Sequence, residues 1–414
     1  MGAFCIQIEH PMKGLLVTGP LSDLRLVELG QLIAGPYCGQ LMGDYGAEVI
    51  KIEDPKRGDP LRDWGQEKKG GHSLWWPIAA RNKKCVTADL RSPEGQQIVK
   101  DLVAQSDMLL ENFRPGTLER WGLGWDELKK INPGLIMIRV SGYGQTGPYA
   151  PRPGYASVGE AMGGLRYVIG EPDRMPSRAG ISLGDSLAAT FATLGALAAL
   201  HHKEKTGEGQ VIDASIYESV LAYMESLVPE WEIAGYQRER TGAVLPKVSP
   251  SNIYPTKSGE MLLIAANMDT VFRRLAKAMG KPELADDPKF ATHIARGENT
   301  AELDDMIGKW SSTWEVHDLM EHLISEEVPH GLVYTAKDML VDPQYQARES
   351  IVDVDVPGIG AFPMQNIFPL FSETKPTIRW SGPTLGEHTD EVYRELLGYD
   401  DAKMADLKAR GIIK

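Results

Sequence analysis

The sequence predicts an α/β protein built around a mostly parallel sheet. Between Leu24 and Val140, short β-rich runs alternate with stretches of helical periodicity, a pattern typical of β-α units that feed a parallel sheet. The chain of 414 residues is longer than one ordinary core requires and 42% of it is hydrophobic, so we expect two domains. Ligands of such sheets gather at the carboxyl ends of the strands.

Each expected element has its own stretch of sequence. In the first half we expect strands at residues 24–29, 47–53, 83–90, 108–113 and 135–144, and helices through 38–46, at 92–107 and ending at 129–134. A second β-α pattern begins at 251–267 and continues through amphipathic stretches at 270–280 and 313–329. The tail from Ile351 is rich in Pro and Gly until residues 389–399 turn helical, which suggests a long connection back to the first domain.

A single carboxylate stands where an apolar run gives way to a helical pattern. Residues 180–200 read GISLGDSLAATFATLGALAAL, with Leu183, Leu187, Phe191 and Leu194 on one predicted helix face. Asp185 is a typical N-cap residue for that helix. Alternatively, the positive field of a helix N-terminus keeps a carboxylate ionised, and an ionised carboxylate can act as a covalent nucleophile. The local sequence does not separate the two interpretations.

Composition and charge exclude several classes of function. The 44 basic against 57 acidic residues give a net charge of -13, which argues against nucleic acid or an anionic membrane as the partner. The three cysteines, Cys5, Cys38 and Cys85, form no C-x-x-C pair, so neither a disulfide framework nor a zinc site is indicated and we expect a cytoplasmic location. The N-terminus lacks a signal-peptide core, and no apolar run approaches membrane-spanning length. The adjacent histidines at 201–202 do not share a helix face, so we assign no metal.

Phosphate-binding glycine motifs are absent, but a basic patch is present. Gly30 and Gly35 do not complete G-x-G-x-x-G, and no Walker-type loop occurs. By contrast, the segment ENFRPGTLERWGLGW places two arginines around a Pro-Gly turn directly after a strand, with two aromatic residues beside them. Such arginines can pair with phosphates while the aromatic surface receives a base. The patch is predicted from Arg114, Arg120, Phe113 and Trp121, with Lys83, Lys84 and Arg91 as further cations; an ordinary charged loop is the alternative.

Several motifs in the same order resemble the family III coenzyme A transferases, which include formyl-CoA and carnitine CoA-transferases and are related to α-methylacyl-CoA racemases. The resemblance runs from about Leu24 to the C-terminus. It is carried by LIAGPYCGQLMGDYGAEVIKIEDPKRGDPLRDWG, ENFRPGTLERWGLG, SGYGQTGP, RAGISLGD, TGEGQVIDASIYESV, VPHGLVYTAKDMLVDPQYQAR and LGEHTDEV.

The resemblance implies a large Rossmann-like domain built from both chain ends, a smaller α/β domain, and an interlocked ring-like homodimer. We accordingly expect a large CoA-binding domain at 20–225, a linker at 226–245, a small domain at 246–340, and a linker and C-terminal return at 341–414. Coenzyme A and acyl-CoA enter as substrates, and no tightly bound cofactor is implied.

The resemblance also assigns roles to single residues. Asp185 matches the catalytic aspartate, which carries the acyl group as an anhydride and then CoA as a thioester. The positions that match CoA contacts are Gln31, Leu32, Ile33, Ala34, Ala88, Leu90, Arg91, Asn112, Phe113, Arg114, Arg120, Trp121 and, near the thioester, Tyr155. Arg166 stands where relatives have a small or apolar residue; it is either a bidentate partner for the second carboxylate of a C4 or C5 dicarboxylic acid or a surface arginine.

Two departures from the family narrow the expected reaction. Residues 243–255, AVLPKVSPSNIYP, replace the glycine-rich loop of formyl-CoA transferase, so oxalate is not implied as a substrate. Tyr155 stands where racemases carry a His, and tyrosine is a poor base at neutral pH. The expected activity is CoA transfer from an acyl-CoA such as succinyl-CoA to a small carboxylic or dicarboxylic acid. A racemase of the α-methylacyl-CoA type and a non-catalytic acyl-CoA-binding protein are the alternatives.

Overall fold

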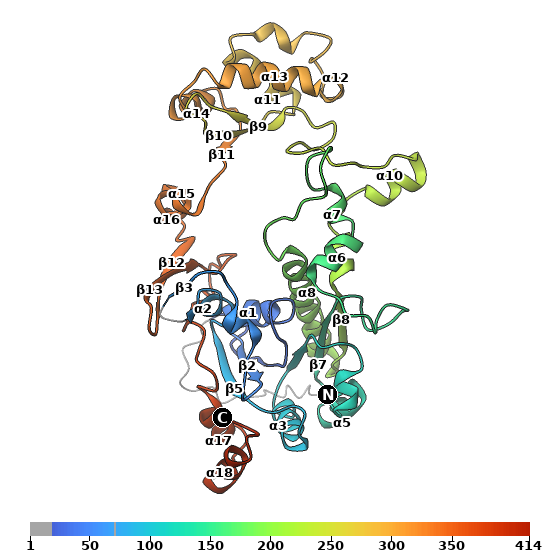
Figure 1. Ribbon diagram of the computed structural model, residues 1–414, viewed down its shortest axis with the longest axis vertical. Helices are drawn as coiled ribbons and strands as arrows, with labels where there is room; N and C mark the ends of the chain where they lie inside the picture. Colours follow the sequence, from blue (N-terminus) through green and yellow to red (C-terminus); the bar gives the residue numbers. More distant parts are fainter. Residues whose placement is uncertain (1–18, 70–71) are drawn as a thin grey trace, which may run out of the picture. The chain divides into compact units, whose positions relative to one another are not determined.

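The computed structural model describes residues 19–69 and 72–414, so Cys5 and the N-terminal stretch examined for a signal peptide lie outside it (Figure 1). The described chain divides into two compact units. The first unit contains the described residues up to Gly163 together with Ser182–Tyr223 and Glu349–Lys414. The second contains Gly164–Ile181 and Met224–Arg348.

A six-stranded sheet, parallel at every pairing, forms the centre of the first unit. Its strands, in the spatial order β5-β2-β1-β6-β7-β8, are β5 (Lys83–Thr87), β2 (Glu48–Glu53), β1 (Arg25–Glu28), β6 (Met108–Glu111), β7 (Ile136–Ser141) and β8 (Val211–Ser215). The predicted α/β class with a parallel sheet is therefore confirmed. The order reverses between β1 and β6, where doubly wound folds bind their ligands.

Helices cover both faces of this sheet, because successive strand residues point to opposite cores. One core joins Val27, Leu109 and Met137 to α3 (Pro93–Val103), α5 (Trp125–Ile131) and the C-terminal helices α17 (Thr389–Glu395) and α18 (Asp401–Ala409). The other joins Leu26, Met108 and Ile138 to α1 (Pro36–Asp44) and α8 (Leu183–Thr206). The remaining elements of the unit are η1 (Pro60–Asp63), β3 (Lys68–Lys69), β4 (His72–Ser73), α2 (Trp76–Ala79), α4 (Thr117–Arg120), α6 (Ala156–Met162), α9 (Ile216–Leu221), β12 (Ile351–Val356) and β13 (Gly360–Gln365).

The helix α8 differs from its sequence-based expectation in two respects. Its buried face consists of small residues such as Ala188, Ala192 and Ala196, whereas Leu194 on the predicted apolar face is 61% exposed. Small side chains allow the helix axis to approach β7 and β8 closely. With 24 residues and a mean hydropathy of 1.4 in its most apolar window, α8 is long and apolar enough to span a membrane, which corrects the expectation that no such run exists. Here it is a core helix of the first unit.

The second unit has its own core around a three-stranded antiparallel sheet of order β11-β10-β9. Its strands are β9 (Ser251–Pro255), β10 (Met261–Ala265) and β11 (His330–Leu332). Its helical segments are α7 (Leu165–Val168), α10 (Leu227–Ala234), α11 (Asp269–Ala278), η2 (Pro282–Ala285), α12 (His293–Glu298), α13 (Thr300–Ser311), α14 (Val316–Ser325), α15 (Ala336–Val341) and α16 (Pro343–Ala347).

The segment 164–181 groups with the second unit, although the sequence analysis assigned it to the large domain. Its local hydrogen bonds explain this placement. The Gly242 amide donates to the Gly170 carbonyl at 3.0 Å, and the Tyr167 hydroxyl donates to Glu239 at 2.8 Å. The end of the chain, in contrast, packs on the first unit, where the Lys414 amide donates to the Thr87 hydroxyl at 2.8 Å.

Candidate active site

The loops that follow β1 and β6 are joined at the point where the strand order reverses. The Gln31 amide donates to the Asn112 side-chain oxygen at 2.8 Å, and the Asn112 side-chain nitrogen donates to the Gln31 carbonyl, also at 2.8 Å. A Cβ at Gly35 would lie only 3.2 Å from the Asn112 side chain, so a larger residue there would press on this joint. The predicted contacts Gln31 and Asn112 are thus brought together.

A shallow recess opens beside this joint, at the carboxyl ends of β1, β2, β5 and β6. Six of the predicted CoA contacts line it, and three further residues were not predicted. In chain order, the lining is Leu29, Gln31, Ile52, Asp54, Ala88, Leu90, Arg91, Phe113 and Trp121. The rings of Phe113 and Trp121 meet edge to face with their centroids 5.3 Å apart. The recess combines apolar and aromatic walls with one cation.

Arg91 supplies that cation at the mouth of the recess. Its guanidinium lies 3.2 Å from a carboxylate oxygen of Asp54 and 3.8 Å from one of Asp89, and its side chain is 74% exposed. Burial raises the pKa of Asp54, but amide hydrogen bonds from Lys56 and Arg57 and the Arg91 guanidinium together hold it below its usual value. Arg91 is therefore held in place by two carboxylates and remains accessible.

The other predicted cations are placed differently. Lys83 is fully buried in an ion pair with Glu28, and Lys84 pairs with Glu48 and Glu391, so neither joins the basic patch. This corrects the prediction for both lysines; their charges neutralise carboxylates of the same unit. Arg114 and Arg120 are exposed, and they lie on the segment after β6 without lining the recess.

The predicted contacts Leu32, Ile33 and Ala34 form the turn between β1 and α1. The side chains of Leu32 and Ile33 pack against a small apolar cluster that contains Leu61, Trp76 and Cys85. Leu32 adopts a left-handed backbone conformation with φ 63°, which is unusual for a residue other than glycine. Its amide donates to both carboxylate oxygens of Asp59, at 3.1 and 3.2 Å.

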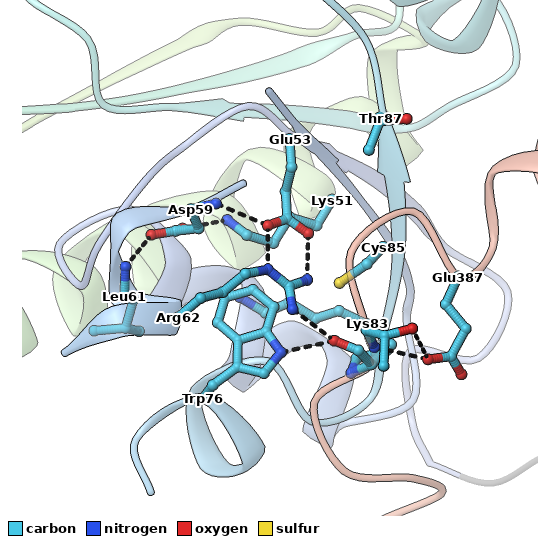
Figure 2. Close-up of polar contacts among 12 residues, drawn as sticks. Lys51, Glu53, Asp59, Leu61, Arg62, Trp76, Lys83, Cys85, Thr87 and Glu387 are labelled. Carbon is cyan, nitrogen blue, oxygen red and sulfur yellow. Dashed lines mark hydrogen bonds and ion pairs between the residues drawn. The ribbon is translucent and has the colours of Figure 1, made fainter. Parts of the chain in front are cut away.

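Sequence reasoning missed the charged groups under this turn. Asp59 pairs with Lys51 at 2.8 Å (Figure 2). Lys51 pairs in turn with Glu28 at 2.8 Å, and all three side chains are no more than 1% exposed. A signal was present, because Lys51 lies among the apolar residues Val49, Ile50 and Ile52 of a predicted strand. A lysine at such a position needs a buried carboxylate partner.

Asp185 is the third residue of α8 and is half-buried. The N-cap of α8 is Ser182, so the interpretation of Asp185 as the N-cap is wrong. The Gly184 amide instead donates to the side chain of Glu160, on α6, at 3.2 Å. A Cβ at Gly184 would lie 3.1 to 3.2 Å from Ala156, Glu160 and Ile216, so the first turn of α8 is tightly seated between α6 and α9.

Two further predicted residues complete the survey. Tyr155 occupies the N-cap of α6 with 69% of its surface exposed. Arg166 lies in α7 of the second unit and is half-buried. Within residues 19–69 and 72–414, no group of three or more His, Cys, Asp or Glu side chains could hold a metal ion.

Comparisons with known proteins place this geometry in a family. The profile described as CoA-transferase family III matches residues 21–389. The succinyl-CoA–D-citramalate CoA-transferase of Chloroflexus aurantiacus is 57% identical over 95% of this chain and 98% of its own length. The succinyl-CoA–L-malate CoA-transferase beta subunit of the same organism is 41% identical over 97% of this chain and all of its own.

A solved structure agrees with these sequence matches. The crystal structure of a CAIB/BAIF family protein from Brucella suis superposes with a TM-score of 0.81 at 33% identity, covering 92% of this chain and 100% of that one. The whole-length matches decide for the transferase over the racemase and the non-catalytic binding protein. The chain belongs to CoA-transferase family III and is an enzyme of the CoA-transferase class.

Proposed function

We propose that this enzyme transfers CoA from succinyl-CoA to a C4 or C5 dicarboxylic acid of the citramalate and malate type. The observation that carries the proposal is the 57% identity over 95% of the chain with a relative named for succinyl-CoA and D-citramalate. A second relative is named for succinyl-CoA and L-malate, so donor and acceptor chemistry agree between the two. Arg166 is the candidate partner for the second carboxylate of the acceptor, since guanidinium binds carboxylate in two parallel hydrogen bonds.

The recess at the β1–β6 joint is the proposed seat of the nucleotide part of CoA. Its position supports this, because open parallel sheets bind nucleotides where the strand order reverses. Phe113 and Trp121 offer an aromatic wall for the adenine, and the accessible guanidinium of Arg91 suits a phosphate. Arg114 and Arg120 can meet phosphates outside the recess. The turn at Gln31–Ala34 and Tyr155 would then lie along the pantetheine and thioester.

Asp185 is the proposed nucleophile. One of its oxygens attacks the thioester carbonyl, and the C–S bond breaks to give an aspartyl–succinyl anhydride and CoA thiolate. The thiolate attacks the aspartyl carbonyl, which releases succinate and leaves an aspartyl-CoA thioester. The acceptor carboxylate then attacks the aspartyl carbonyl, and the C–S bond of the aspartyl-CoA thioester breaks to give an acceptor–aspartyl anhydride and CoA thiolate, which reverses the second step. Finally the thiolate attacks the acceptor acyl carbonyl, the bond from that carbonyl to the Asp185 oxygen breaks, and the free Asp185 carboxylate is restored. Protons and electrons balance without an added base.

The position of Asp185 suits this role electrostatically. In the first turn of a 24-residue helix it lies at the positive end of the helix dipole, which favours the ionised form. The Glu160 carboxylate accepts a hydrogen bond from the Gly184 amide, so a group from α6 helps to fix the start of α8.

An interlocked homodimer in the cytoplasm completes the proposal. Large apolar side chains on and beside α10, including Val228, Trp231 and Ile233, are 56 to 84% exposed in the single chain, which supports burial against a second chain. The cysteines Cys38 and Cys85 are free and buried, in keeping with a reducing compartment.

Light scattering should give a dimer mass that persists on dilution. A stable folded monomer would contradict the dimer, and since one relative is a beta subunit, a mixed complex is a further outcome that would contradict it.

The catalytic proposal is tested with purified protein, succinyl-CoA and a panel of D-citramalate, L-malate and glutarate, with CoA ester products identified by mass spectrometry. Asp185→Ala should abolish transfer while CoA binding persists, and hydroxylamine should trap an acyl derivative on Asp185 of the wild-type protein. Asp126→Ala is the matched control, because Asp126 is an exposed carboxylate in the first turn of α5. Substantial turnover by Asp185→Ala would exclude the nucleophile.

A further inference from the structure

Asp59 holds the unusual conformation of Leu32 from beneath. It lies at the start of η1, is 1% exposed, and accepts hydrogen bonds from the Leu32 amide and, at 2.9 Å, from the Leu61 amide. Its second oxygen pairs with the Lys51 ammonium at 2.8 Å (Figure 2). Left-handed backbone is unfavourable for leucine, so the amide contact must offset that cost.

The two ends of the same turn are held by lysines. Lys51 donates to the Gly30 carbonyl at 2.8 Å, and Lys83 donates to the Pro36 carbonyl at 2.6 Å. Both lysines pair with Glu28, at the carboxyl end of β1. The anchors at Gly30, Leu32 and Pro36 are therefore charges that are buried and paired, whereas Gln31 is held by the neutral side chain of Asn112.

The buried charges balance. Burial alone lowers the pKa of Lys51, but the attraction of Asp59 and Glu28 raises it, so the lysine stays charged. Burial raises the pKa of Asp59, yet the Lys51 ammonium and the hydrogen bonds from Leu61 and Leu32 bring it below its usual value. Glu53 completes the group: it accepts from the Asp59 amide at 2.8 Å and pairs with Arg62 at 2.7 Å. Such a network is rigid when complete, and removal of one charge leaves its partner buried and unpaired.

We propose that Asp59 is a positioning residue for CoA transfer, fixing Leu32 in its left-handed conformation so that the backbone of residues 31–34 is ordered before the thioester arrives. The inference rests on the proposed function, because that function lays residues 31–34 along the thioester. Asp59 is 1% exposed, so in this proposal it acts through Leu32 and not on the substrate. Its loss is expected to slow the chemical step and to leave binding of CoA nearly unchanged, since the recess beside Arg91 is untouched.

The test compares Asp59→Asn with Asp44→Asn in the full-length enzyme. Asp44 is a matched control because it is also buried and paired with a cation, Arg81, at 2.6 Å, but it lies at the far end of α1. Asp59→Asn should lower kcat by about tenfold or more, since small displacements of a reacting geometry are costly. The dissociation constant for CoA should change by less than about threefold. Asp44→Asn should destabilise the fold and keep kcat.

A second variant makes the role of Leu32 explicit. Glycine adopts left-handed backbone without penalty, so Leu32→Gly removes the strain that Asp59 offsets. In that background the Asp59→Asn change should lower kcat by no more than about threefold, a non-additivity expected only of directly coupled residues. If Asp59→Asn does not fold, Asp59→Glu keeps the charge for Lys51 while moving the carboxylate off the Leu32 amide, and the same fall in kcat is expected.

Hydrogen exchange separates this inference from the proposed function. Amides of residues 29–35 should exchange faster in Asp59→Asn than in the wild type or Asp44→Asn, whatever the reaction catalysed. Unchanged exchange there, equal losses of kcat in both variants, or full additivity with Leu32→Gly would overturn the positioning role. Absence of CoA transfer in the wild type would overturn the proposed function and leave the exchange result standing.

Discussion

Gly184→Ala tests whether the seating of α8 sets the position of Asp185. The added Cβ would lie 3.1 Å from the Ala156 carbonyl oxygen, 3.1 Å from the Glu160 side chain and 3.2 Å from the Ile216 side chain. Three such contacts are tighter than ordinary packing, so α8 or its neighbours must give by a few tenths of an ångström, and we expect α8 to take up the shift. Because Asp185 is the next residue, it moves with the helix start.

Gly184→Ala should change both the free energy of unfolding and kcat. The first change is the difference between two opposing effects on stability, and the second follows from the displacement of Asp185. Overpacking costs about 1–3 kcal/mol, and replacing glycine by alanine within a helix returns roughly 0.5–1 kcal/mol, so we expect a net loss of about 1 kcal/mol. A misplacement of 1 Å costs about a hundredfold in rate, so a shift of about 0.3–0.5 Å corresponds to roughly four- to tenfold in kcat.

The assay combines thermal unfolding with steady-state transfer. Gly308→Ala in α13 is the control, since its Cβ would meet only Tyr254 at 3.9 Å, an ordinary contact. That variant should gain stability by about 0.5–1 kcal/mol and keep its kcat. If Gly184→Ala behaves like Gly308→Ala in both measurements, the tight seating of α8 does not control the position of Asp185.

Three further outcomes are expected. Arg91→Ala should raise the KM for the CoA ester about tenfold with little change in kcat. Arg120→Ala should raise KM less, because Arg120 lies outside the recess. Equal increases in KM would contradict the assignment of a CoA phosphate to Arg91. Burial raises the pKa of Glu111 to about 7, although the guanidinium of Arg139 lowers it. Between pH 4.5 and 7 the Glu111 carboxyl is therefore protonated in the folded state and ionised in the unfolded chain. The free energy of unfolding should therefore fall, relative to Glu111→Gln, as pH rises from about 4.5 to 7 and level off above that, in pH-dependent urea titrations; a parallel profile would contradict the shift. Incubation with succinyl-CoA in heavy water should leave the α-hydrogens unexchanged, whereas rapid uptake by mass spectrometry would indicate racemase-type chemistry.

The sequence predicted the sheet well because burial on both faces gives near-continuous apolar strands. The residues that line the recess could be grouped in the same way, since Ala88 and Phe113 lie at the ends of predicted strands, Trp121 lies in the segment after one of them, and parallel strands end at a common edge. The start of α8 was misplaced by the strong capping preference of aspartate, because the group that holds the Gly184 amide, Glu160, comes from a different helix. Local propensity contains no information about such a contact.

The charged network failed to appear in the sequence analysis for a related reason. Lys83 and Lys84 stand side by side in one strand, yet alternation sends Lys83 to the interior and Lys84 to the surface. The residue type alone does not distinguish the two lysines. Only the register of β5 against β2, and of β2 against β1, shows that Lys83 faces Glu28. Buried pairs between strands are set by register, which sequence alone leaves open.

The network also explains how this fold works without a glycine-rich fingerprint. In dinucleotide-binding folds, glycines after the first strand let the backbone turn tightly and approach a phosphate. Here Leu32 makes the left-handed turn at that place, and Asp59 supplies the stabilisation that glycine would not need. The turn thereby keeps two apolar side chains, Leu32 and Ile33, anchored in the interior against Trp76 and Cys85. A backbone shaped by buried charges does not depend on a bound phosphate for its order. This suits the proposed reaction, in which a thioester and a carboxylate must be aligned before the C–S bond breaks.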